Sequence, residues 1–292
     1  MNSSSACVEA IRRDVPLAGQ TWFGLGGSAR YWASPTSRGQ LAGVLRWAVE
    51  QSIAVRVLGR GANVLVRDRG FDGLVIRLDQ PAFCAVRYRG QDVHAGGGAN
   101  LMHLARDCVR RGLGGIECLA GIPATIGGAV TMNAGGRYGQ ISDVVESVEL
   151  MERDGSVHEV GAADLGFGYR RSSVADRVVL GVRFRLSRCS TDDVVGRFHA
   201  YWREKSESQP LADHCAGCMF KNPPGMSAGK LIDDSGLKGM HVGRARVSQR
   251  HANFIVADRG ASADDVLELV RLVRDRVRRR AGVLLELEID VW

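Results

Sequence analysis

The chain has 292 residues, 45% of them hydrophobic and 6% aromatic, and its formal net charge is +7. This length can bury a substantial core and favours two domains with a ligand cleft between them. No apolar run could span a bilayer, the first residues lack the order of a signal peptide, and no basic block alternates with aromatic residues. We therefore expect a cytoplasmic protein that binds neither a membrane nor a nucleic acid.

Residues 21–190 predict an α+β domain rather than a regular β-α-β alternation. Apolar periodicity and capping signals indicate helices over 37–52 and 100–112. Alternating or short apolar runs between glycine-rich turns indicate strands over 54–58, 64–68, 74–78, 84–89, 144–155 and 177–187. Residues 1–20 form a separate N-terminal segment.

Residues 191–292 have a different texture and predict a second domain. A helix stops before Pro210, and a loop-rich stretch runs to about residue 260. Ser262 and Asp265 resemble a capping box that opens a helix ending at Gly282. Residues 283–292 predict a strand with apolar side chains on one face and Glu286, Glu288 and Asp290 on the other. A solvated sheet face is the simplest reading of these carboxylates.

Two turns are rich in glycine in a way that suits an anionic ligand. In "VLGRGANVLV" (57–66), Gly59 and Gly61 let successive backbone N–H groups close around a phosphate, although a plain tight turn is the alternative. Val64 replaces the third glycine of the Rossmann fingerprint and a strand follows, so that motif is excluded. The stretch "AGIPATIGGAVTMNAGGRYG" (120–139) permits close approach of a large flat ligand. With a third run at 94–100, the turns favour an extended, phosphate-bearing cofactor.

The basic residues and the cysteines also limit the function. Only four of the 39 basic residues are lysine, and this arginine excess reflects either a usage bias or an affinity for anions such as diphosphates. The seven cysteines are scattered and odd in number, which indicates reduced thiols. In "CAGCMFKNP" (215–223), a redox pair would need a helix that the prolines disfavour, and a zinc site would need a second ligand pair. We expect no metal.

Seven motifs, taken in order, resemble the UDP-N-acetylenolpyruvoylglucosamine reductases (the MurB family) from about residue 21 to the C-terminus. They are "GLGGSARYW", "LGRGANVLVRDRGFDGLVIRL", "LAGIPATIGGAVTMNAGG", "FGYRRS", "GCMFKNPPGMSAGKLIDDSGLKG", "VSQRHANFIV" and "LELEIDV". The resemblance implies a vanillyl-alcohol-oxidase-like (PCMH-type) FAD-binding domain in two subdomains over 21–190 and an α+β substrate domain over 191–292. It also implies the shorter class of the family, which lacks a tyrosine loop, and we expect a monomer.

The activity that the resemblance implies belongs to peptidoglycan synthesis. NADPH reduces non-covalently bound FAD, and the flavin reduces the enolpyruvyl ether of UDP-N-acetylglucosamine to UDP-N-acetylmuramate. Hydride addition places negative charge on the α-carbon and its carboxylate, so the site needs a cation and a proton donor. Arg170 matches the family arginine that stabilises the enolate, and Glu288 matches its terminal carboxylate.

Cys218 stands where most of the family has serine as the proton donor, which makes Cys215 a bystander. A thiol, with a pKa of about 8.5, is a far stronger acid than an alcohol, and it is also open to oxidation. One further departure is Ile289-Asp290, where the family often has Val-Arg, so a cation near the flavin is missing.

The resemblance carries two further groups of residues. The cofactor set comprises Gly59, Arg60, Gly61, Ala62, Asn63, Val64, Gly121, Ile122, Thr125, Gly127, Gly128 and Ala129. The substrate set comprises Tyr169, Lys205, Lys221, Asn222 and His251, and a structural role is the alternative for each. Another flavin oxidoreductase or oxidase of the same fold, and a catalytically decayed nucleotide-binding relative, are the competing functions.

Overall fold

The computed structural model describes residues 11–174, 176–211 and 213–292, which group into two compact units. Neither unit is continuous in sequence. The first contains residues 11–13, Tyr31–Arg60 and Asp72–Glu204, and the second contains Asp14–Arg30, Gly61–Phe71 and Lys205–Trp292. The expected domain boundaries after residues 20 and 190 stay predictions.

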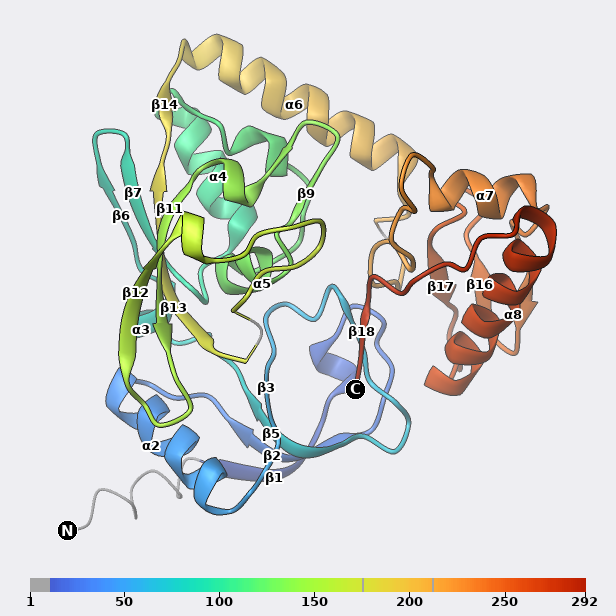
Figure 1. The fold of residues 1–292 in the computed structure, drawn as a ribbon, viewed down its shortest axis with the longest axis horizontal. Helices are drawn as coiled ribbons and strands as arrows, with labels where there is room; N and C mark the ends of the chain where they lie inside the picture. Colours follow the sequence, from blue (N-terminus) through green and yellow to red (C-terminus); the bar gives the residue numbers. More distant parts are fainter. Residues whose placement is uncertain (1–10, 175, 212) are drawn as a thin grey trace. The chain divides into compact units, whose positions relative to one another are not determined.

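The first unit is built around a five-stranded sheet of order β12-β11-β13-β7-β6, in which every pair is antiparallel. Its strands are β6 (Val86–Arg89), β7 (Asp92–Gly96), β11 (Val145–Met151), β12 (Val157–Gly161) and β13 (Val178–Arg185). Helices α4 (Leu101–Arg110) and α5 (Ile126–Thr131) supply buried residues to the same hydrophobic cluster as this sheet (Figure 1).

A second hydrophobic cluster of the first unit forms under α2 (Arg38–Glu50). It includes residues of β3 (Val55–Val57), which pairs in parallel with β5 (Phe71–Ile76) in a four-stranded sheet of order β1-β2-β5-β3. β1 (Ile11–Pro16), β2 (Ser28–Ala33) and β5 each continue across a division between the units. The short elements are α3 (Pro81–Cys84), β8 (Leu113–Gly114), η2 (Glu117–Leu119), β9 (Gly135–Gly136), β10 (Gly139–Gln140), η3 (Ile141–Asp143), η4 (Ala162–Asp164) and β14 (Ser187–Arg188).

The second unit packs α8 (Ala263–Ala281) against β15 (His241–Val242) and β16 (Ala245–Val247) (Figure 1). Its remaining elements are η1 (Ala18–Gln20), β4 (Val64–Leu65), α7 (Ala228–Asp234), β17 (Ile255–Ala257) and β18 (Asp290–Val291), and α6 (Thr191–Ser208) crosses into it. β18 pairs in parallel with β4, so Asp290 lies opposite Val64.

The predicted long helices are confirmed, because local signals define them. Ser37 and Asn100 cap α2 and α4 by accepting N–H groups of the first turn. Ser262 and Asp265 form the capping box of α8, and Gly282 ends it with a φ of 71°. α6 stops at Ser208, before Pro210.

Three predicted strands were wrong in extent. Residues 84–89 begin with the end of α3, whose first residue is Pro81, so the strand starts at Val86. Of the strand predicted over 64–68, only Val64 and Leu65 form one, as β4. Of residues 283–292, only Asp290 and Val291 form a ladder, although Leu285 and Ile289 are buried as the alternation predicted.

The described cysteines are free thiols, and Cys7 lies outside the described residues. Within the described ranges, no helix is both long and apolar enough to cross a membrane. Nor does this part of the chain bring three or more His, Cys, Asp or Glu side chains together as a metal site would require.

Candidate functional site

The first glycine loop, residues 59–63, follows β3 and leads into β4. Gly61 has a φ of 69°, and a Cβ at this position would lie 2.5 Å from the carbonyl oxygen of Gln20. Only glycine therefore allows this packing. The amide N–H groups of residues 59–62 donate to no acceptor in the described part of the chain. The hydroxyl of Thr21, next to Gly61, is buried and has no hydrogen-bond partner either. Such unused donors suit an anionic group.

The second glycine loop uses most of its amides internally. The N–H groups of Ile126 and Gly127 donate to the carbonyls of Ala99 and Gly97, at 2.9 and 2.7 Å. The hydroxyl of Thr125 accepts the N–H of Gly128 and caps α5. The glycines here therefore serve close packing more than anion binding.

The third run, 94–100, is explained by the fold itself. A Cβ at Gly97 would lie 1.9 Å from the carbonyl oxygen of Val179, and one at Gly98 would lie 1.7 Å from that of Leu78. The close approach that these glycines permit is to the chain's own backbone, and Gly96 belongs to β7. This run gives no support to the cofactor interpretation.

The two predicted cofactor loops meet within the first unit. A Cβ at Gly59 would lie 2.6 Å from the hydroxyl oxygen of Thr125. The structure thus brings together two residues of the predicted cofactor set that are far apart in sequence.

Tyr169 and Arg170 form the tip of a tight turn in the first unit. The backbones of Gly168 and Arg171 exchange hydrogen bonds on either side of the turn, and Arg170 has a positive φ of 55°. This backbone conformation is rare for a residue with a side chain. It is strained and persists only where the surrounding structure enforces it. The guanidinium carbon of Arg170 lies 5.2 Å from the centre of the Tyr169 ring.

Asn133 holds this turn from the second glycine loop. Its side chain is 1% exposed and donates to the carbonyl of Gly168 at 3.0 Å and to the side-chain oxygen of Gln140 at 3.1 Å. Its own oxygen accepts the N–H of Ser142. Buried amides satisfied in this way fix the backbone that they bind. The sequence interpretation did not single out Asn133; its only signal is a polar residue within an apolar, small-residue stretch.

The two thiols of the CxxC segment differ in environment. Cys215 is 2% exposed, its S–H donates to the carbonyl of Pro210, and burial raises the pKa of its thiol to about 11. Cys218 is half-buried. Of the two, Cys218 is the more accessible thiol.

A buried asparagine holds the residues that follow Cys218. Asn253 is 2% exposed, and its side chain accepts the N–H of Phe220 at 2.9 Å and donates to the carbonyl of the same residue at 2.7 Å. Its backbone carbonyl accepts the N–H of Met219 at 2.7 Å. Asn253 was also missed from sequence, although it lies in the quoted motif "VSQRHANFIV".

Residues 286–288 run antiparallel beside this segment in the second unit. The N–H of Glu288 donates to the carbonyl of Met219 at 2.9 Å, and the N–H of Lys221 donates to the carbonyl of Glu286 at 2.8 Å. The side chain of Asn63 donates to the carbonyl of Glu288 at 3.1 Å. Cys218 and Glu288 therefore lie on neighbouring segments, tied to the first glycine loop, whereas Arg170 belongs to the first unit.

Three of the predicted substrate residues also lie in the second unit. The ammonium group of Lys221 is 3.7 Å from the Glu286 carboxylate. The side-chain oxygen of Asn222 accepts the N–H of Ala228 at the start of α7, which is a structural role. Nδ1 of His251 accepts the N–H of Asn253, and burial, followed by the charge of Lys238, lowers the pKa of the imidazole.

Lys205, the remaining predicted substrate residue of the second unit, and Asp290, the departure from the family pattern, lie elsewhere in it. Lys205 lies in the last turn of α6. The carboxylate of Asp290, at the position where the family often has arginine, accepts the indole N–H of Trp292 at 2.8 Å. This acidic side chain is thus built into the terminal strand.

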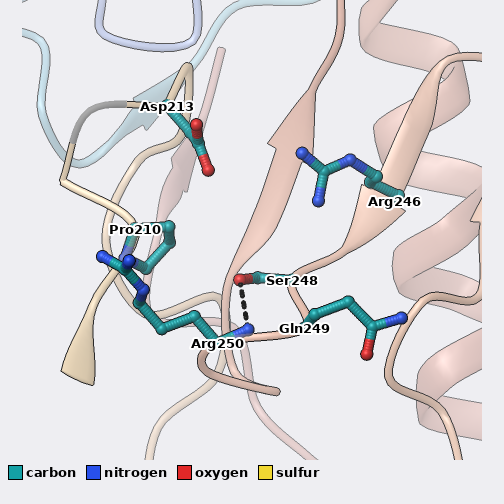
Figure 2. Close-up of a pocket in the computed structure, with 6 residues that line it drawn as sticks. All are labelled: Pro210, Asp213, Arg246, Ser248, Gln249 and Arg250. Carbon is teal, nitrogen blue, oxygen red and sulfur yellow. Dashed lines mark hydrogen bonds between the residues drawn. The ribbon is translucent and has the colours of Figure 1, made fainter. Parts of the chain in front are cut away.

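The second unit also contains a cavity of about 240 Å³. Figure 2 shows its six lining residues: Pro210, Asp213, Arg246, Ser248, Gln249 and Arg250. The guanidinium of Arg246 is paired with Asp258 at 3.1 Å, and that of Arg250 donates to the carbonyls of Ser206 and Gln209. Both guanidinium groups that line the cavity are therefore already bound to other groups of the chain. No predicted site residue lines the cavity.

Two family models match this chain. The model of an FAD binding domain matches residues 29–161, and the model of the C-terminal domain of UDP-N-acetylenolpyruvoylglucosamine reductase matches residues 209–292. A variant of Phl p 4, a glucose oxidase, has a TM-score of 0.50 at 17% identity over 65% of this chain and 45% of its own, a likeness of fold alone. The expected fold class, an FAD-binding α+β domain joined to a C-terminal α+β domain, is confirmed.

Relatives named UDP-N-acetylenolpyruvoylglucosamine reductase match nearly the whole chain. The protein of Moorella thermoacetica is 41% identical over 97% of this chain and 93% of its own length, and reductase 2 of Symbiobacterium thermophilum is 40% identical over 97% and 92%. The crystal structure of UDP-N-acetylenolpyruvylglucosamine reductase (MurB) from Thermus caldophilus has a TM-score of 0.84 at 42% identity, covering 97% of this chain and 99% of that one. With sequence, domain order and fold in agreement, the chain belongs to the UDP-N-acetylenolpyruvoylglucosamine reductase family.

Proposed function

We propose that this chain uses FAD and NADPH to reduce the enolpyruvyl group of UDP-N-acetylenolpyruvoylglucosamine, which gives UDP-N-acetylmuramate for peptidoglycan synthesis. The observation that carries the proposal is the arrangement in the second unit, where hydrogen bonds connect the segment after the Cys218 thiol, the backbone of Glu288 and the end of the first glycine loop at Asn63. Family membership over nearly the full chain supports the same reaction. We assign FAD to residues 21–190 and the nucleotide substrate to residues 191–292.

The residues present fit an FAD diphosphate. The unused amides of residues 59–62 and the buried hydroxyl of Thr21 are suitable diphosphate donors, and Thr125 of the second glycine loop lies beside Gly59 of this loop. When bound and reduced by NADPH, FAD supplies the hydride for the β-carbon of the substrate. The carboxylate of Asp290 accepts the indole N–H of Trp292. At this position the chain therefore has a structural hydrogen bond in place of the family's cation.

The chain's own groups handle the charge and the proton. The guanidinium of Arg170 stabilises the negative charge that develops on the substrate carboxylate, and the tight turn fixes the backbone that carries this side chain. The thiol of Cys218 then donates its proton to the α-carbon, and Glu288 acts on the same charge from the neighbouring segment. Tyr169, Lys205, Lys221 and His251 are our candidates for substrate contacts, and Asn222 orients the start of α7.

Stopped-flow absorbance tests the proposal directly. The flavin of the purified protein is reduced with NADPH without oxygen, and UDP-N-acetylenolpyruvoylglucosamine is then added. We expect rapid reoxidation of the flavin with formation of UDP-N-acetylmuramate. Reoxidation by oxygen but not by this substrate would assign the chain to the oxidases of the fold instead. A colourless protein that takes up no FAD would identify a decayed relative.

We further infer that the protein acts as a monomer in the cytoplasm. Analytical ultracentrifugation should give a mass near 31.6 kDa. A sedimenting species of twice this mass at working concentration would contradict a monomer.

A further inference from the structure

One asparagine outside the predicted site controls the backbone beside the proton donor. Asn253 makes three hydrogen bonds to the two residues that directly follow Cys218. Its backbone carbonyl binds Met219, and its side chain makes two bonds to Phe220. Both the asparagine and Phe220 are nearly inaccessible, at 2% and 1% exposure, so water cannot replace these bonds.

A side-chain amide suits this position at any pH. It carries a donor and an acceptor on one planar group, and it therefore pairs with the N–H and the C=O of Phe220 as a neighbouring strand would. Loss of the amide would leave two buried backbone groups of Phe220 without partners, and the segment would have to move to satisfy them.

The same residues support the carboxylate. The carbonyl of Met219 accepts the N–H of Glu288, so movement of Met219 displaces Glu288 together with Cys218. The N–H of Asn253 in turn donates to Nδ1 of His251 at 3.2 Å, which fixes Nδ1 as the acceptor nitrogen of that ring. Asn253 thus connects three residues of the candidate site, through its side chain at Phe220 and through its backbone at Met219 and His251.

We propose that Asn253 is the positioning residue that holds the Cys218 thiol and Glu288 in register for proton delivery. The proposal rests on the function proposed above. Asn253 itself transfers no proton. It fixes the backbone of Met219 and Phe220 and thereby the position of the Cys218 thiol.

The first experiment separates the two half-reactions in Asn253→Ala. We expect flavin reduction by NADPH to stay within about twofold of the wild type, and flavin reoxidation by the enolpyruvyl substrate to fall about 10- to 100-fold, as for a misplaced reacting group. An equal loss in both half-reactions, or no loss in the second, would overturn the proposal.

The second experiment needs no turnover. Iodoacetamide labelling is followed by mass spectrometry of peptide 206–221, with fragment ions that separate Cys218 from Cys215. Asn253→Ala should raise the labelling rate of Cys218 at least about threefold, with Cys84 and Cys189 unchanged. Asp68→Ala is the matched control, since Asp68 also accepts two backbone N–H groups of the second unit, those of Ala263 and Asp264. It should leave Cys218 labelling unaltered.

Labelling also separates the two proposals from each other. A wild type that fails to reduce the substrate would refute the proposed function. Cys218 labelling would still report whether Asn253 holds the segment from Cys218 to Phe220. A labelling rise at every cysteine, or at none, would reduce Asn253 to a general fold residue and overturn the positioning role.

The third experiment is rescue by protonation. In Asn253→Asp, a neutral carboxyl can accept from the N–H and donate to the C=O of Phe220, whereas a carboxylate repels that carbonyl. Burial raises the pKa of such a carboxyl. The reoxidation rate of this variant, divided by the wild-type rate at each pH, should therefore rise as the pH falls from about 9 to about 6. A ratio that is flat across this range would contradict the proposed bonds, and Asn253→Ala should show no rescue.

Discussion

The contact between the two glycine loops can be tested with Gly59→Ala and Thr125→Ala. The new Cβ at position 59 would lie 2.6 Å from the Thr125 hydroxyl oxygen, well inside normal contact, but 3.6 Å from its Cβ. The threonine side chain must therefore rotate away and release the N–H of Gly128, which it accepts at 3.2 Å as the cap of α5.

The magnitude follows from these contacts. Losing the cap costs about 1 kcal/mol, and an unfavourable side-chain rotamer adds about 1 kcal/mol. Replacing glycine returns about 0.4–1 kcal/mol through the unfolded chain. Gly59→Ala should thus destabilise the protein by about 1 kcal/mol, and Thr125→Ala by about the same through the cap. In the double variant the clash is gone and the cap is lost only once, so it should be more stable than the sum of the single effects predicts, by about 2 kcal/mol.

Urea unfolding followed by circular dichroism gives the four free energies of this cycle, and flavin fluorescence gives the FAD affinity of each variant. We expect the pattern of FAD affinity to follow that of stability, with Gly59→Ala binding weakest. Additive single effects, within about 0.5 kcal/mol, would refute the contact on which the reasoning depends.

Three further predictions concern the second unit. Cys218→Ser should keep the rate of substrate-driven flavin reoxidation within about tenfold of the wild type, because a hydroxyl can still donate a proton, whereas Cys218→Ala should abolish reoxidation. Stopped-flow absorbance measures both rates. An alanine variant with normal turnover would remove this thiol from the mechanism. Asp68→Ala should lower the free energy of unfolding by about 1–2 kcal/mol, since the N-terminus of α8 loses its carboxylate acceptor, with no change in reoxidation. The lowered pKa of His251 means that the unfolded chain takes up a proton before the folded one does. Its contribution to stability is present above about pH 6.5 and is lost as the pH falls through the folded pKa. The wild type should therefore lose more stability than His251→Gln between about pH 7 and 5 in urea titrations, and parallel curves would contradict this assignment.

The sequence predicted the long helices well because their signals are local. Ser262, Asp265 and Gly282 define both ends of α8 within the segment itself. The terminal strand could not be bounded in this way, because a ladder needs a partner. Residues 286–288 form a single bridge to the segment at Phe220, and pairing resumes only beside β4.

The same limit applies to the site. The motifs contained Arg170, Cys218 and Glu288, and the resemblance gave each a role that remains a proposal. The supports of these residues carried no such signal. Asn253 lies 33 residues from the backbone that it binds, and Asn133 lies 35 residues from the carbonyl of Gly168. Contacts over such separations depend on the tertiary fold and not on the local pattern.

The pairing of β18 with β4 also sets an order on the maturation of the protein. Asn63 and Glu288 are 225 residues apart, and the strands beside them join the first quarter of the chain to its final residues. The nascent polypeptide can form the five-stranded antiparallel sheet while translation continues, because all of its strands lie within residues 86–185. Asn63 acquires its bonds with Glu288 and Asp290 only after these residues have left the ribosome. We therefore expect prosthetic-group loading to be a post-translational event, and prematurely released polypeptides to lack it.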